Sequence, residues 1–550
     1  MGITDALRTI NVRATPQSAP ASAGQVVNSA GGFVFTVDDR TRLRRFLTLG
    51  TEAGSYYVTE RELTKQNARF LIALAQRDPR LVVDEAVAIS LAGRAPKQNP
   101  TLFALAVVAG VADEDGRAYA LSRLAEVART GTHLALFVTY VQQFRGWGRG
   151  LRRAVGQWYS EKTPDAVAYQ TLKYRSREGW TPRDLLRKSH PVAHDEAQAR
   201  LFDYITHGVP EGGVVPEGLP ALVAAYEEAK TASVPRLVEL IAQQPLSWEM
   251  LPTEALASRE VWEALIEQRM PVMALMRQLS RLTRLGVLDG ACGAEVARRL
   301  SDRDTLVKAR VHPISVLVAL RTYASGRGAR GSGTWEPIGR IVDALDAGFY
   351  AAFQAVEPTG KRTLLALDVS GSMVMPIGGT PLTCRDASAA LALVTAATEP
   401  DHEILGFTAK GKDSFTVSGG ARSYGSAIAR LPITPRQRLD DVIKVVDHLP
   451  FAGTDCALPM LWATEQKTPV DTFVVYTDNE TWAGDIHPRQ ALRQYREVMG
   501  IPAKLVVVGM TATQFTIADP DDAGMLDVAG FDASVPTVIA DFSSAEVPSA

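Results

Sequence analysis

Five oxygen-bearing side chains in the last third of the sequence could together bind a metal ion. Asp368, Ser370 and Ser372 are spaced by two residues in Asp-Val-Ser-Gly-Ser-Met, so one tight turn can bring their side chains together. Thr454 in Gly-Thr-Asp adds a third hydroxyl group, and Asp478 in Tyr-Thr-Asp-Asn adds a second carboxylate. Hard oxygen ligands that carry little negative charge suit one divalent cation, and Mg²⁺ is the ion that we expect.

The two carboxylates lie at or just after the ends of strand-like runs. After residue 360, short apolar runs alternate with helical stretches, which predicts a mostly parallel, doubly wound α/β sheet. The predicted strands are Thr363–Val369, Ile404–Phe407, Phe473–Tyr476, Leu505–Val508 and Val538–Ala540, and the predicted helices are Ala387–Thr398, Arg438–His448 and Pro488–Met499. In such a sheet, ligands bind at the carboxyl ends of the strands, where Asp368 and Asp478 are expected.

The order of these groups resembles the metal-ion-dependent adhesion site of the von Willebrand A family, in which D-x-S-x-S is followed by Thr and then by Asp. The resemblance implies a metal ion with an open coordination position that an acidic oxygen of a partner can fill, so the site would be a receptor. The structural alternative is a polar turn with a serine cap. A haloacid dehalogenase phosphatase needs a second aspartate where Ser370 stands, and Gly360-Lys361 lacks the rest of a P-loop.

The first two thirds of the chain have a helical pattern. From about residue 38 to residue 355, apolar side chains recur at helical spacing, as in Val272, Leu275 and Leu279. Pro and Gly divide this pattern into short helices, which predicts antiparallel helix pairs stacked as a HEAT-like solenoid. We therefore expect an irregular N-terminus over 1–25, an all-α unit over 26–360 and an α/β unit over 361–550.

The charges of the chain are divided unevenly between these two parts. Residues 361–550 carry 15 Lys and Arg against 23 Asp and Glu, whereas residues 1–360 carry 44 against 38. The basic excess is concentrated between Arg145 and His190, with 11 basic and 4 acidic residues. Arg guanidinium groups bind phosphate, and interleaved aromatic side chains can stack on bases, so RNA is a plausible ligand. On residue type alone, Trp147, Trp158 and Trp180 fit a hydrophobic core better than base platforms.

Composition excludes several other classes of protein. Three widely spaced cysteines do not form a disulfide framework and fit a reducing cytoplasm. No apolar run approaches the roughly 20 residues of a membrane helix, so no membrane partner is expected. No Cys and His residues have the spacing of a zinc site.

The chain resembles the Ro autoantigen (TROVE-domain) family over nearly its whole length. The segments that carry the resemblance include Gly31-Gly-Phe-Val-Phe, Gly146-Trp-Gly-Arg149, Asp184-Leu-Leu-Arg187, Lys308-Ala-Arg-Val-His-Pro313 and Tyr476-Thr-Asp-Asn-Glu480. The resemblance implies a ring of helical repeats joined to a von Willebrand A domain. It also implies that small noncoding Y RNA binds the basic outer surface and that misfolded RNAs place a single-stranded 3′ end in the central hole.

Specific RNA-binding residues follow from the same resemblance. Lys173, Arg177 and His190 match the family's positions that contact Y RNA, and Lys173 and Arg177 are expected on one helical face. Three further arginines are expected near them because of their place in the sequence: Arg149, Arg152 and Arg153.

Because nothing in the sequence calls for catalysis, we expect a binding protein without catalytic activity. The family resemblance implies that it acts in RNA quality control, RNA decay or ribosomal RNA maturation. An exoribonuclease such as polynucleotide phosphorylase is the implied protein partner. A rival hypothesis is a metal-dependent protein-adhesion scaffold whose RNA binding is incidental. A nuclease that uses the metal is a weaker hypothesis, because the sequence lacks the clustered carboxylates of a two-metal site.

Overall fold

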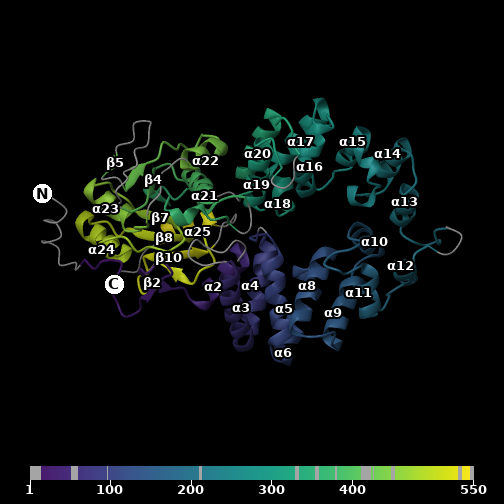
Figure 1. Ribbon diagram of the computed structural model, residues 1–550, viewed down its shortest axis with the longest axis horizontal. Coiled ribbons are helices and arrows are strands. Elements are labelled where there is room, and N and C mark those ends of the chain that lie inside the picture. The colour runs from purple at the N-terminus through teal and green to yellow at the C-terminus, as the bar shows by residue number, and fades with distance from the viewer. Residues whose placement is uncertain are drawn as a thin grey trace.

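The structure is a computed structural model in which an α/β unit lies at one end of a helical assembly (Figure 1). It describes residues 14–50, 60–95, 97–209, 214–328, 333–353, 358–377, 381–409, 423–424, 427–447, 453–529 and 535–545. The predicted order, with an all-α part before an α/β part, is confirmed. No helix among these residues is long and apolar enough to cross a membrane.

The α/β unit contains a seven-stranded sheet with the strand order β10-β8-β7-β3-β4-β6-β5. Its strands are β3 (Thr363–Asp368), β4 (His402–Phe407), β5 (Ser423–Tyr424), β6 (Ile428–Arg430), β7 (Thr472–Thr477), β8 (Lys504–Gly509) and β10 (Met525–Ala529). Its helices are α21 (Cys384–Thr398), α22 (Leu439–Asp447), α23 (Leu458–Glu465), α24 (Pro488–Met499) and α25 (Val535–Ser544). Strands β3, β4, β7, β8 and β10 pair in parallel, so the doubly wound α/β prediction is confirmed.

The prediction of a strand at Val538–Ala540 is wrong. These residues lie in α25, which has Pro536 in its first turn, a position where proline favours a helix because its amide hydrogen bond is not needed. The strand at the sheet edge is instead β10, which pairs with β8. Asp527 interrupts the apolar run of β10, so the sequence pattern of this strand is weak.

The helical part consists of short helices arranged in two rows (Figure 1). The first row contains α2 (Asp39–Leu49), α3 (Glu60–Arg77), α4 (Pro79–Ala92), α5 (Asn99–Val111), α6 (Glu114–Ser122), α7 (Leu124–Val127), α8 (Gly131–Phe144), α9 (Arg149–Ser160), α10 (Pro164–Lys173), α11 (Pro182–Ser189) and α12 (Glu196–His207). The second contains α13 (Ala221–Ala229), α14 (Val234–Gln243), η1 (Trp248–Met250), η2 (Glu254–Ala257), α15 (Arg259–Glu267), α16 (Val272–Arg284), α17 (Gly290–Ser301), α18 (Arg303–Lys308), α19 (Pro313–Ala324) and α20 (Gly339–Ala351).

Proline marks the starts of several of these helices, as the sequence pattern predicts. Pro164 and Pro182 occupy the first turns of α10 and α11, where their fixed φ angle suits the helix. Thr163 and Thr181 precede them, and their side chains accept hydrogen bonds from backbone amides that the helix leaves unpaired. Trp158 and Trp262 are almost completely buried between the helices.

Both ends of the helical part contact the α/β unit, so the two parts form a closed circuit (Figure 1). At the N-terminal end, β1 (Val26–Val27) and β2 (Phe33–Thr36) form a small sheet with β9 (Phe515–Thr516). At the other end, the backbone N–H of Leu439 at the start of α22 donates to Asp346 of α20 at 2.9 Å. Strands β1 and β2 fall in the region expected to be all-α, because strands of two and four residues carry too little pattern to be recognised.

Candidate metal centre and nucleic-acid interface

Asp368 is the last residue of β3, and its carboxylate organises the turn that follows. Oδ1 accepts a hydrogen bond from the backbone N–H of Ser370 at 2.9 Å, and Oδ2 accepts one from the hydroxyl of Thr477 at 2.7 Å. The hydroxyl oxygens of Ser370 and Ser372 lie 3.1 Å apart. All of these side chains are buried, so the spacing of two residues does bring the three predicted groups together.

Two further predicted ligands present buried oxygen atoms without a hydrogen-bond partner in the described part of the chain. These atoms are the hydroxyl of Thr454 and Oδ2 of Asp478, which follows β7. Because buried polar atoms are nearly always paired, such atoms point to a ligand. Asp368, Ser370, Ser372, Thr454 and Asp478 therefore fit a divalent cation bound by oxygen atoms.

Electrostatics at this site also favour a bound cation. Burial raises the pKa of Asp368, and burial together with the charge of Asp368 raises the pKa of Asp478 to about 7. Burial and the charge of Asp478 raise the pKa of Glu480 to about 8. Within the described ranges no three His, Cys, Asp or Glu side chains form a metal cluster, so this site depends on hydroxyl groups and has room for water ligands.

A tryptophan missed by the sequence analysis borders the site. The backbone amide of Trp482 donates to the carbonyl oxygen of Thr454 at 3.1 Å. The indole lies against Gly453, where an added Cβ atom would be only 2.6 Å from the ring. Trp482 is 41% exposed, whereas the other seven tryptophans of the chain are buried or half-buried.

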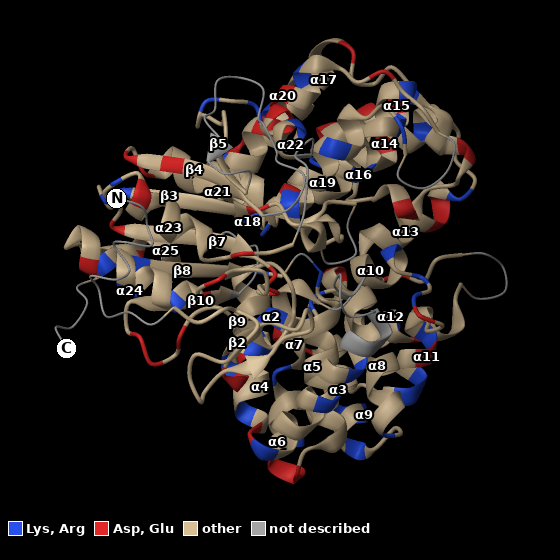
Figure 2. Ribbon diagram, turned by 60° about the vertical axis from the view of Figure 1, so that its left-hand side comes forward, with Lys and Arg blue, Asp and Glu red and all other residues tan. Residues whose placement is uncertain are grey.

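Lys and Arg residues are frequent along the first row of helices, including α9 and α11 (Figure 2). Arg145, Arg149 and Arg153 line a groove of about 1000 Å³ beside α6 and α8, together with Glu114. All three arginines are exposed, and none has an acidic partner within the described ranges. Arg149 and Arg153 are four residues apart on α9, so both face this groove.

A second basic pocket lies between residues of α9 and α11. It has a volume of about 370 Å³ and is lined by Arg152, Asp184, Arg187, Lys188 and His190. The carboxylate of Asp184 is occupied by the cap of α11, where it accepts from Thr181. His190 ends α11 in a left-handed conformation with φ of 49°. The structure thus brings Arg152 and His190 together in one pocket, and Arg149 and Arg153 line the neighbouring groove.

Lys173 and Arg177 do not share a helical face, so that expectation is wrong. Helix α10 ends at Lys173, and Arg177 lies in a turn that forms an isolated β-bridge with Trp180. The side chain of Lys173 is only 9% exposed, and its Nζ lies 3.8 Å from Glu249. Arg177 is exposed and lies beside the ring of Tyr174.

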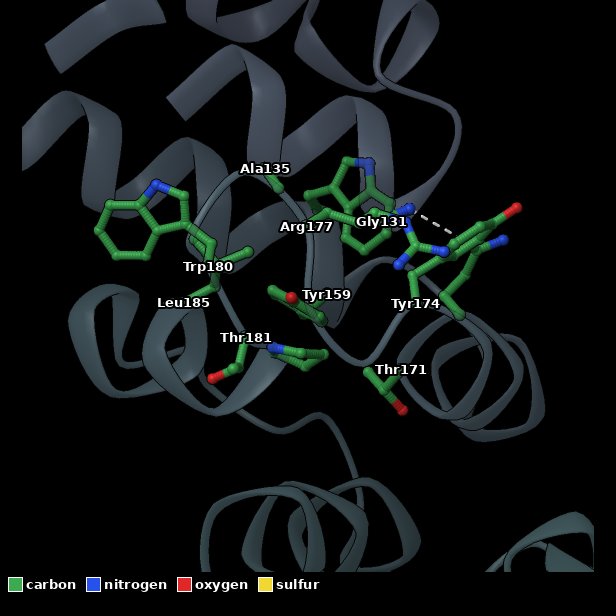
Figure 3. A pocket seen from close by; sticks show the side chains of 12 residues that line it. Gly131, Ala135, Tyr159, Thr171, Tyr174, Arg177, Trp180, Thr181 and Leu185 are labelled. Atoms are coloured by element: carbon green, nitrogen blue, oxygen red, sulfur yellow. Dashed lines mark hydrogen bonds between the residues drawn. The ribbon is translucent and has the colours of Figure 1, made fainter. Parts of the chain in front are cut away.

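Of the three tryptophans of this region, Trp158 lies in the core, and Trp147 and Trp180 pack against it. Figure 3 shows Trp180 and Arg177 around a pocket with a volume of only about 10 Å³, which is too small for a nucleobase. Trp147 packs edge-on against Trp180 with 5.7 Å between the ring centroids, and both are half-buried. Trp158 is 1% exposed. Base stacking on these three rings is therefore not supported.

Comparison with known proteins covers both parts of the chain. The Ro60 vWA domain model matches residues 362–543, and the TROVE domain model matches residues 26–211 and 239–322. The chain belongs to the Ro (TROVE) family. Two Ro family relatives are named RNA-binding protein RO60. The one from Deinococcus radiodurans is 41% identical over 98% of this chain and 99% of its own length. The one from Caenorhabditis elegans is 37% identical over 97% of this chain and 92% of its own length.

A solved structure of the Ro family is also similar to this chain. The crystal structure of the Deinococcus radiodurans RO (RSR) protein matches with a TM-score of 0.67 and 40% sequence identity. The match covers 92% of this chain and 99% of that chain. The helical part followed by a von Willebrand A domain is thus the architecture of a Ro family member.

Several residues of these sites were not recognised from the sequence. Arg187 and Lys188 line the second basic pocket, and Arg145 lines the groove. All three lie in the basic stretch between Arg145 and His190, so the excess of basic residues pointed to them. Their spacing alone did not show which of them would line the groove and which the pocket.

Proposed function

We propose that this chain is the RNA-binding protein of a Ro ribonucleoprotein particle. A small noncoding RNA of Y type would bind the basic outer surface around α9 and α11, and misfolded RNAs would place single-stranded 3′ ends in the hole of the ring. The particle would act in the cytoplasm in RNA quality control, RNA decay or ribosomal RNA maturation. The groove that contains Arg145, Arg149 and Arg153 carries this proposal, and the names of the relatives support it.

The groove supports RNA binding because its cations are not neutralised by the protein. Three exposed guanidinium groups without acidic partners in the described part of the chain repel one another and attract polyanions. Arginine binds phosphate oxygens in a bidentate geometry, and each contact with the backbone releases a counterion. Binding should therefore weaken steeply with salt.

The test removes two cations from the groove. We expect Arg149→Ala with Arg153→Ala to weaken binding of a stem–loop RNA with a single-stranded 3′ tail more than about ten-fold, because two phosphate contacts are lost. The slope of log affinity against log salt should fall by about 1 to 2. Filter binding over a series of salt concentrations measures both quantities.

The matched control is Arg298→Ala on α17. Arg298 is exposed, but it is paired with Glu295 at 2.8 Å, so its loss should leave RNA affinity nearly unchanged. Equal affinities for the groove variant and the wild type would rule out this RNA site.

The residues that match the family's Y-RNA contacts need a separate test. Lys173→Ala with Arg177→Ala is expected to weaken binding of a Y-type RNA more than about ten-fold. Since Lys173 is nearly buried, Arg177→Ala alone should account for most of the loss. His190→Ala and Arg152→Ala test the second pocket in the same assay. If Lys173→Ala alone weakened RNA binding as much as the double variant does, the larger contribution assigned to Arg177 would be wrong.

The alternative function is a protein-adhesion scaffold. In that case a Mg²⁺ ion held by Asp368, Ser370, Ser372, Thr454 and Asp478 would supply an open coordination position for an acidic group of a partner, such as an exoribonuclease. Thr454 and Asp478 each present a buried oxygen that has no hydrogen-bond partner among the described residues, and this favours the second role. Asp368→Ala should spare RNA binding under the main proposal and abolish partner binding under the alternative.

A further inference from the structure

The N-terminal segment that includes β1 and β2 contacts both loops of the cation site. We infer that residues 14–36, called the N-terminal strap below, position the ligand loops and thereby couple cation affinity to closure of the ring. This inference rests on the proposed cation site. The two loops are 453–455, which contains Thr454, and 478–482, which contains Asp478.

Gln17 joins the two ligand loops through one buried side chain. Its Nε2 donates to Oδ1 of Asp455 at 2.8 Å, and its Oε1 accepts from the hydroxyl of Thr481 at 2.5 Å. The same Nε2 also donates to the carbonyl oxygen of Ile486 at 2.9 Å. Gln17 is completely buried, so these bonds form away from competing water.

Asn28 holds the second loop from another side. Its Nδ2 donates to the carbonyl oxygen of Thr481 at 2.9 Å, while its Oδ1 accepts from the backbone N–H of Gly32 at 2.8 Å. The backbone N–H of Ala30 donates to Oε2 of Glu480 at 3.2 Å. A Cβ atom at Gly32 would lie 1.9 Å from the carbonyl oxygen of Thr481, so only glycine allows this close approach.

Thr481 connects the strap contacts to the metal ligands. Its hydroxyl accepts from the backbone N–H of Cys456 at 3.1 Å, so it also ties the loop after β7 to the loop of Thr454. Asp478 lies three residues before Thr481, and Thr454 lies one residue before Asp455. The bonds of Gln17 therefore act on the backbone that sets the distance between these two ligands. Groups that bond directly to a metal ligand change metal affinity by roughly 10- to 100-fold when they are lost, and Gln17, which bonds to the residues beside the ligands, is expected at the lower end of that range.

The other end of the strap continues into the ring. Strand β2 pairs with β9, and the backbone N–H of Val37 donates to the carbonyl oxygen of Gln514 at 2.9 Å. The next residue, Asp38, caps α2, the first helix of the first row. Displacement of α2 from the α/β unit would therefore pull on the strap. Because coupling between two sites is reciprocal, cation binding must then stabilise the docked strap.

The test compares two glutamine substitutions within the strap. Gln17→Leu should weaken Mg²⁺ binding by about ten-fold or more in isothermal titration calorimetry on the full chain. Gln25→Leu is the comparison variant. Gln25 bonds to Ala21, Ser22, Phe33 and His487 and to neither ligand loop, so its loss should weaken Mg²⁺ binding less than the loss of Gln17. Equal Mg²⁺ affinities for the two variants, with wild-type affinity, would overturn the inference.

A second measurement needs no substitution. In the wild type, saturating Mg²⁺ should slow amide hydrogen exchange in residues 14–36 and leave α17, on the far row, unchanged. Unchanged exchange in the strap would overturn the inference even if Gln17→Leu does not fold. A wild type that binds no Mg²⁺ would instead refute the proposed cation site, so the two failures are distinguishable.

Discussion

We expect Arg45→Ala to weaken the contact between α2 and the α/β unit. Arg45 lies on α2 with no exposed surface, and its guanidinium group bonds to three acceptors of the α/β unit. These are the carbonyl oxygens of Thr513 at 2.9 Å and Phe515 at 2.6 Å, and Oδ2 of Asp527 at 2.5 Å. Alanine removes all three bonds and leaves the carboxylate of Asp527 without its cation.

The size of the effect follows from the burial of this ion pair. Breaking a buried pair by removing one partner costs about 3–5 kcal/mol, because the remaining charge is desolvated and unpaired. The charged form of Asp527 is already unfavourable, because burial raises its pKa and its Oδ1 has no hydrogen-bond partner among the described residues. A loss of about 3 kcal/mol in a local opening reaction corresponds to about a hundred-fold faster amide exchange.

Hydrogen exchange read by mass spectrometry on Asp39–Leu49 measures this opening. The control is Arg77→Ala. Arg77 of α3 pairs with Asp39 of α2, but both side chains are well exposed, so a loss of less than about 1 kcal/mol is expected. Arg45→Leu combined with Asp527→Leu should recover much of the loss, because neither charge remains buried. The reasoning is refuted if α2 exchanges at the wild-type rate in Arg45→Ala, or if the double variant opens as readily as Arg45→Ala.

Three further outcomes are expected. Burial, and to a smaller extent the charge of Arg129, lowers the pKa of His133 from 6.5 to about 4. Between pH 6.5 and pH 4 the unfolded chain therefore binds more protons than the folded chain, and the folded state loses stability as the pH falls through this range. When the pH is lowered from 7 to 4, the free energy of unfolding of the wild type should fall by roughly 3 kcal/mol more than that of His133→Gln, as measured by urea denaturation. Mg²⁺ at about 100 times its dissociation constant should stabilise the wild type by about 2.7 kcal/mol, and Asp478→Asn should abolish this gain in the same assay. A labelled RNA incubated with the protein and Mg²⁺ should remain full-length on a denaturing gel, whereas cleavage that disappears in Asp368→Ala would establish a nuclease.

The sequence predicted the sheet and the convergence of the metal ligands well, for a physical reason. Buried parallel strands are continuous apolar runs, and their carboxyl ends must meet at one edge, so Asp368 and Asp478 could be placed without coordinates. The unpaired oxygens of Thr454 and Asp478 agree with that placement. The identity of the ion and the RNA-binding roles of the six predicted basic residues stay predictions.

The remaining features depend on contacts between residues far apart in the chain. The strap residue Gln17 bonds to Asp455, more than 400 positions later, and nothing in the local sequence marks it. The prediction that Lys173 and Arg177 share a helical face was wrong. A spacing of four residues places two side chains on one face only if both lie in the helix, and α10 ends at Lys173. The prediction of a strand at Val538–Ala540 was wrong because an apolar run of three residues fits a strand and a helix equally well.

The exposure of Trp482 also gives the protein an optical probe at the cation site. A soluble quencher such as acrylamide reaches the most exposed indole first, and the other seven tryptophans are buried or half-buried. The quenchable part of the emission should thus come chiefly from the ring that lies against Gly453. Occupancy of the site by a cation, and then by a partner's acidic group, could be followed by fluorescence in the unlabelled wild-type chain, with Trp482→Phe as the blank.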